Sequence, residues 1–79
     1  MQNNNISLTT LNVGDSGTIT EIHGGDGVKH RLAALGLRIG TKITKVSTQM
    51  MKGPVTIKAG STQVAIGYGM AHKIEVSIS

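Results

Sequence analysis

The sequence predicts a mainly β domain, a small antiparallel β-barrel of about five strands with one short helix over about 27–36 and a helical turn over about 68–72. Three observations support this class. Apolar residues alternate with polar ones in several short segments, glycine-rich turns separate those segments, and helical spacing occurs in one place only. The 79 residues suffice for one domain, 1–79, with residues 1–5 as a flexible tail. Closing the sheet into a barrel would remove its exposed edges.

The helix is predicted from its apolar face and from its stop signal. Leu32 and Leu35 lie three residues apart and share a helical face, which Val28 extends. Gly36 stands where a helix usually ends, because glycine adopts the left-handed C′ conformation without a Cβ penalty. Leu37 would then be C″ and Leu32 would be C3, the two positions that touch in a Schellman motif.

The remaining elements follow from the alternation and the turns. Asp26 is the expected N-cap of the helix. Ile19 and Ile22 have opposite parity within one strand, which predicts a bulge or a bend there. Leu11 and Val13 are expected to pack onto the core. Strands are predicted at 18–23, 41–47, around 55–57, around 64–66, and at 74–78.

Composition limits the classes of function. Eight Lys and Arg against four Asp and Glu give a net charge of +4, which suits either simple solubility or an acidic partner. The chain has no cysteine, and its polar N-terminus does not resemble a signal peptide, so we expect a cytoplasmic protein. No apolar run approaches the roughly 20 residues that span a bilayer.

Three motifs together resemble the FeoA family. The first is Leu32-x-x-Leu35-Gly36-Leu37-x-x-Gly40, the second Gly53-Pro54-Val55-x-Ile57, and the third Ala71-x-x-Ile74-x-Val76. The resemblance implies an SH3-like barrel and a small cytoplasmic, non-enzymatic accessory protein of ferrous iron uptake. Such a protein would bind and modulate the cytoplasmic part of the FeoB transporter, which would recruit it to the inner face of the membrane. Ile39 departs from the proline that the family often has there.

Two groups of residues are candidates for the partner surface. Lys29, Arg31 and Arg38 supply positive charge that would steer an acidic partner. Met50 and Met51 are adjacent, so both cannot face the core of a regular strand, and a pliable apolar contact is the alternative to core packing.

A divalent transition metal, iron in particular, is the alternative ligand. Glu21 and His23 lie two apart on a predicted strand and therefore face the same way, with His30 or Asp26 nearby in sequence. Solvated side chains are the simpler interpretation, as they are for His72 beside Lys73. The alternative function is accordingly direct metal binding or sensing.

Other classes of function have less support. The glycine-rich stretches lack a phosphate-loop pattern, and no nucleophile and base are paired by a motif, so we expect no enzyme. RNA binding is a further alternative for a small basic barrel. Tyr68 is the only aromatic residue, however, and single-strand binders generally stack bases on aromatic side chains.

Overall fold

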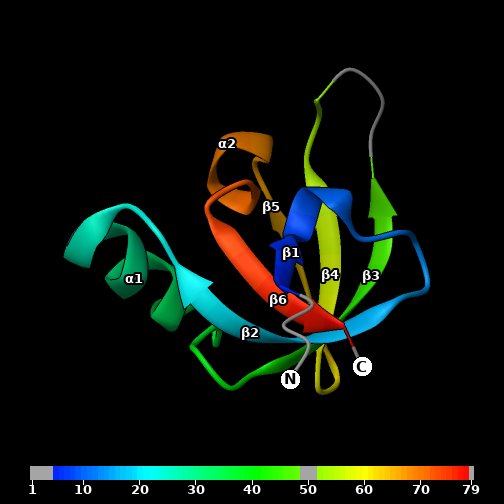
Figure 1. Ribbon diagram of the computed structural model, residues 1–79, viewed down its shortest axis with the longest axis horizontal. Coiled ribbons are helices and arrows are strands. Elements are labelled where there is room, and N and C mark those ends of the chain that lie inside the picture. Colours follow the sequence, from blue (N-terminus) through cyan, green and yellow to red (C-terminus); the bar gives the residue numbers. More distant parts are fainter. Residues whose placement is uncertain (1–4, 49–51, 79) are drawn as a thin grey trace.

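The computed structural model describes residues 5–48 and 52–78. Six antiparallel strands form one sheet in the order β1-β6-β2-β3-β4-β5 (Figure 1). The chain passes in turn through β1 (Asn5–Ser7), η1 (Leu8–Thr10), β2 (Ser16–Ile22), α1 (Gly25–Ala34), β3 (Lys42–Thr48), β4 (Val55–Ala59), β5 (Thr62–Ile66), α2 (Tyr68–Ala71) and β6 (Ile74–Ile78). The mainly β class, the single long helix and the helical turn are confirmed.

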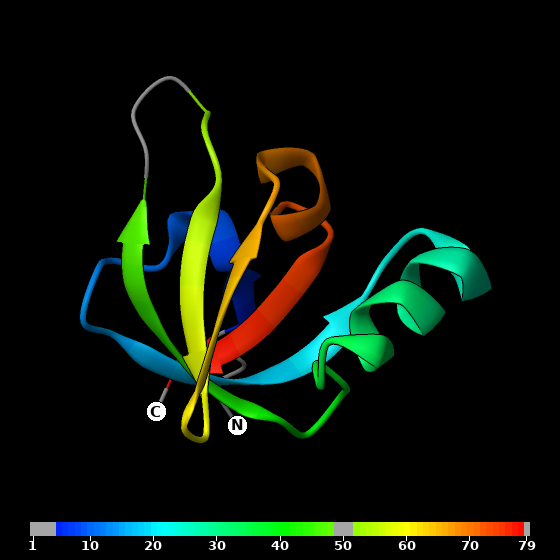
Figure 2. The ribbon, with the colours of Figure 1, turned by 180° about the vertical axis from the view of Figure 1, so that it is seen from behind.

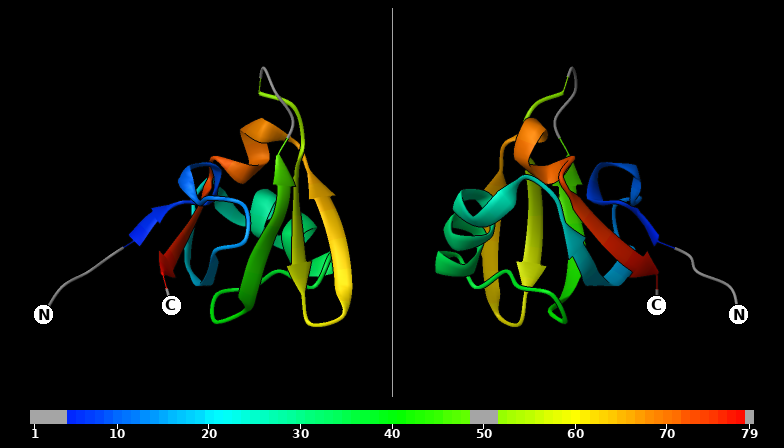
Figure 3. Two further views of the ribbon diagram at one scale, coloured as in Figure 1. Left: turned by 90° about the vertical axis from the view of Figure 1, so that its right-hand side faces the viewer. Right: turned by 60° about the vertical axis from the view of Figure 1, so that its left-hand side comes forward.

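The sheet curls into a barrel-like shape without closing. β3, β4 and β5 lie side by side as one wall, and β1 and β6 lie on the opposite side (Figure 3). β1 and β5 are its two edges, so the predicted full closure is wrong. The register shifts between Ile19 and Glu21, where β2 meets β6, and between Lys45 and Ser47, where β3 meets β4. The first irregularity is the one that the parity of Ile19 and Ile22 predicted.

One apolar core fills the curve of the sheet. α2 and η1 lie at one end of the strands, while α1 extends to the side from the end of β2 (Figures 1 and 2). The buried apolar side chains come from every described helix and strand except β1, and are Leu8, Leu11, Ile19, Ile22, Leu32, Leu37, Ile43, Val55, Ile57, Ile66, Ala71, Ile74 and Val76.

Four local expectations need correction. The predicted tail ends one residue too late, because Asn5 begins β1 and pairs with Ser77 of β6. Val13 is 55% exposed because it lies in the loop before β2, whereas Leu11 is buried. Leu35 is 45% exposed because α1 ends at Ala34 and Leu35 has left the helical conformation. The fourth correction concerns the N-cap of α1 and is described with the site.

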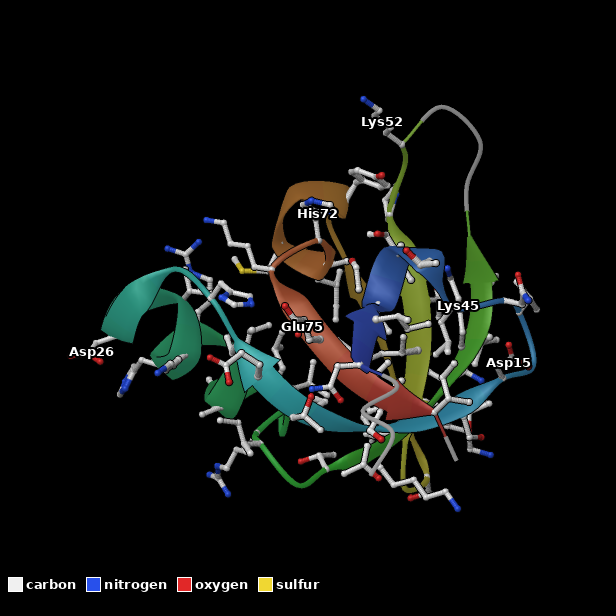
Figure 4. The ribbon with its side chains drawn as sticks, in the orientation of Figure 1. Asp15, Asp26, Lys45, Lys52, His72 and Glu75 are labelled. Carbon is white, nitrogen blue, oxygen red and sulfur yellow. The ribbon has the colours of Figure 1, made fainter. Side chains whose placement is uncertain are left out.

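A buried lysine joins η1 to the sheet. Lys45 points inward from β3 and is only 3% exposed. Its Nζ donates hydrogen bonds to the main-chain oxygens of Leu8, Thr9 and Leu11, at 3.4, 3.1 and 2.6 Å. Figure 4 shows Lys45 beside η1 at β3. The oxygen of Leu8 also accepts from the amide of Leu11 at 3.3 Å. The ammonium group is thus a second donor to Leu8 and the donor to Thr9 and Leu11, because the final carbonyls of a helical turn lack partners within the turn.

Two effects act on the charge of Lys45. Burial favours the neutral amine, whereas the three carbonyl acceptors favour the charged ammonium group. Among the described residues no carboxylate forms an ion pair with it. Burial lowers the pKa of Lys45 below its usual range, because the charged form loses hydration. The three hydrogen bonds therefore offset part of the cost of desolvating the ammonium group.

We expect Lys45→Met to destabilise the domain by about 2 kcal/mol, because the substitution removes the donor to the oxygens of Thr9 and Leu11. For a domain of this size, that loss lowers Tm by roughly 8–16 °C. Thermal unfolding followed by circular dichroism measures it. Lys58→Met is the control, because Lys58 is exposed on β4. Equal Tm values for the two variants would show that the three hydrogen bonds contribute no net stability.

Candidate functional site

The C-terminal end of α1 is fixed by a Schellman motif. The amide of Leu37 donates to the oxygen of Leu32, and the amide of Gly36 donates to the oxygen of Ala33, both at 2.9 Å. Gly36 has φ +86°, and both Leu32 and Leu37 are buried. This is the motif that the sequence predicted, and it directs the chain from α1 back to the end of β2.

The loop after α1 is held by its own hydrogen bonds. The amide of Arg38 donates to Oγ1 of Thr41 at 3.1 Å, and the amide of Thr41 donates to the oxygen of Arg38 at 3.0 Å. The amide of Gly40 donates to the oxygen of Ile19 at 2.7 Å, which fastens the loop to β2. Arg38 and Ile39 are therefore presented by an anchored backbone.

The N-terminal end of α1 differs from the prediction. Gly24 is the N-cap, with φ +106° and no side-chain cap, and α1 begins at Gly25. Asp26 lies in the first turn of the helix, where its negative charge suits the positive end of the helix dipole. The prediction of an Asp26 cap is wrong because the two preceding glycines both adopt positive φ and start the helix earlier.

An apolar groove lies between α1, the end of β2 and the loop after α1. It encloses about 320 Å³. Its lining residues are Ile22, Lys29, Ala33, Leu37, Arg38 and Ile39. Ile22 and Leu37 belong to the core, with 4% and 0% exposure, whereas Ile39 is 60% exposed. The groove therefore combines a recessed apolar floor with an apolar rim and two cationic side chains.

The structure divides the predicted cationic group between two faces. Lys29 and Arg38 line the groove. Arg31 lines a separate open hollow with Asp26, Gly27 and His30. The sequence could not separate these side chains, because the division depends on how α1 docks beside β2. Met50 and Met51, the other partner-surface candidates, lie outside the described residues.

The candidate metal ligands are not gathered into one cluster. His23 contacts Glu75 instead, with Nε2 and Oε2 2.7 Å apart on the exposed side of the sheet. Glu21 lies opposite Glu75 in the register of β2 and β6, and His30 lies on α1. Within 5–48 and 52–78, no three His, Cys, Asp or Glu side chains are arranged to hold a metal ion.

The His23–Glu75 pair is a feature that sequence reasoning missed. It lines a hollow of about 430 Å³ with Asn5, Ile6, Ser7, His72 and Lys73. Oδ1 of Asn5 is buried and has no hydrogen-bond partner among the described residues. Figure 4 shows His72 at the end of α2 and Glu75 on β6. The side chain of His72 is exposed, as expected from the sequence, and that of Glu75 is partly exposed. Glu75 lies between the buried Ile74 and Val76 of β6, and such alternation indicates an outward-facing side chain but not which residue of β2 it meets.

Comparison with known sequences identifies a family and a relative. The FeoA domain profile matches residues 6–78. A Methanocaldococcus jannaschii protein that carries the name Fe(2+) transport protein A is 36% identical over 63 residues, which cover 80% of this chain and 74% of the relative. No helix in the described ranges is long and apolar enough to cross a membrane.

Comparison with solved structures supports the same fold. The crystal structure of an iron uptake regulatory protein, FeoA, superposes with a TM-score of 0.88 and 31% identity, covering 95% of this chain and 99% of the other. A manganese-dependent transcriptional repressor superposes with a TM-score of 0.89 over all of this chain but 44% of its own, at 20% identity. The repressor therefore shares the fold as one part of a longer chain.

We expect Gly36→Ala to destabilise the domain by about 1 kcal/mol, because alanine disfavours the left-handed backbone at φ +86°. A Cβ at this position meets no atom within 4 Å, so the cost is conformational rather than steric. Chemical denaturation measures it. Gly69→Ala, at an open position of α2 without positive φ, is the control and should be neutral or stabilising. A neutral Gly36→Ala would mean that the loop does not depend on this conformation.

Proposed function

The chain belongs to the FeoA family, and we propose that it is a non-enzymatic accessory protein of ferrous iron uptake that binds the cytoplasmic part of a FeoB transporter. The family membership supports the role in ferrous iron uptake. The binding of the transporter is proposed from the family resemblance and from the surface at the end of α1. Location in the cytoplasm, with recruitment to the membrane by the transporter, belongs to the same proposal.

The groove beside α1 is the observation that carries the proposal. Ile39 exposes apolar surface at its rim, and Lys29 and Arg38 add positive charge at its border. Apolar contact surrounded by charge is typical of protein interfaces, in which charge speeds encounter and apolar burial slows dissociation. Arg31 lies on the neighbouring face of α1 and would add to the steering field.

We expect the double variant Lys29→Glu, Arg38→Glu to bind the purified cytosolic region of the cognate transporter at least tenfold more weakly than the unsubstituted protein. Reversing two charges removes attraction and adds repulsion, and the loss should be larger at low salt. Isothermal titration calorimetry at two salt concentrations measures it. The matched control is Lys42→Glu, Lys58→Glu, which reverses two exposed charges on β3 and β4. Absence of binding by the unsubstituted protein would contradict the proposed partner.

Direct binding of a divalent transition metal is the second candidate, favoured by the His23–Glu75 pair. An imidazole nitrogen and a carboxylate oxygen are ligands that ferrous iron accepts, and both residues line an open hollow. The bound metal would then be either the transported ion or a signal that reports its concentration.

If this second function holds, Mn²⁺ should broaden amide NMR signals around His23 and Glu75 first, because paramagnetic broadening falls steeply with distance. His23→Gln should abolish the effect, and His30→Gln is the control on α1. Broadening centred on His30 of α1, or none at millimolar Mn²⁺, would contradict a site at this pair.

A further inference from the structure

The groove beside α1 has a shape that receives a side chain. Its floor, formed by Ile22, Ala33 and Leu37, is continuous with the core. Ile39 stands at the rim with 60% of its surface exposed. A partner side chain placed against this floor would lose its apolar surface to Ile22 and Leu37 below and to Ile39 beside it. Burying apolar surface in this way is the main source of affinity at such sites.

The groove also favours an occupant with negative charge. Lys29 projects from α1 and Arg38 from the loop, so cations approach the groove from two elements. No carboxylate lines it, and neither cation forms an ion pair with any described residue. The net charge of +4 adds to this local field. An occupant with carboxylates on both sides of its apolar residue would meet complementary charge.

The backbone of the loop that borders the groove is preorganised. The Schellman motif and the bonds of Thr41 and Gly40 hold the backbone on which Arg38 and Ile39 are mounted. A preformed groove loses little conformational entropy on binding, so even a small contact can be specific. At about 320 Å³, the volume lies near the lower end of the range of about 300–1,000 Å³ for ligand pockets.

We propose that this groove binds a short acidic segment of a partner protein that inserts one large apolar side chain between Ile22 and Ile39, while flanking carboxylates pair with Lys29 and Arg38. This inference rests on the proposed function and specifies the chemistry that the transporter must present. A protein segment suits the groove better than a lipid surface, because the apolar floor is recessed and a membrane is contacted by apolar side chains that project.

Peptide display on the intact, immobilised protein tests the proposal directly. A random library of twelve-residue peptides should yield acidic sequences with a single Leu, Ile, Met or Phe, enriched at least tenfold over the input. Ile39→Asp should reduce capture of the selected peptides more than tenfold. Val13→Asp is the matched control, since Val13 is a similarly exposed apolar residue in a different loop. Thermal unfolding confirms that both variants are folded.

Several outcomes overturn the inference. Basic or proline-rich selected sequences contradict the proposed charge, and acidic sequences that bind Ile39→Asp as well as the original protein contradict the proposed place. Binding to phosphatidylglycerol vesicles that depends on Ile39, with no peptide enriched, assigns the groove to membranes.

Competition separates this inference from the proposed function. If the cytosolic region of the transporter displaces the selected peptides, the result supports both the proposed partner and the proposed groove. If the transporter region binds the protein but Ile39→Asp leaves that binding unchanged, the groove is not the binding site, whereas the proposed partner is supported. If the peptides bind the groove while the transporter region does not bind at all, the proposed partner is wrong, whereas the groove is supported as a peptide-binding site.

Discussion

The contact between the Lys45 ammonium group and the carbonyls of Leu8, Thr9 and Leu11 is the constraint on which the closed end of the fold depends. An unclosed sheet leaves its core exposed at the ends, and η1 is too short to be stable alone. One cation on β3 satisfies three acceptors of the segment that covers the core. Leu8 and Leu11, whose oxygens accept two of those bonds, have buried side chains.

The side of the domain beyond β2 is arranged differently. There the cover is α1, tied down by backbone hydrogen bonds at its C-terminal end rather than by a buried charge. The tight turn keeps Leu32 and Leu37 inside and leaves Ile39 outside on an anchored loop. The apolar floor and the exposed rim of the groove are therefore two results of the same turn.

What could be predicted from the sequence is what depends on neighbours along the chain. The end of α1 follows from the spacing of Leu32, Gly36 and Leu37, and the bend of β2 follows from the parity of its two isoleucines. Lys45 could not be recognised as buried, because its acceptors lie 34 to 37 residues away and belong to the backbone. The His23–Glu75 contact spans 52 residues. Strand β1 was missed because three residues carry no periodic signal and pair only with β6.

The order of strands determines when the domain can be completed during synthesis. β6, which follows the other five strands in the sequence, lies between β1 and β2, which precede the others. β1 therefore has no strand to pair with until the C-terminal segment has left the ribosome, and β2 lacks one of its two neighbours until then. Contacts so distant in sequence form slowly, because a long loop must close before they contribute. Until β6 has emerged, the nascent chain therefore exposes the whole of β1 and one edge of β2, whose other edge can already pair with β3.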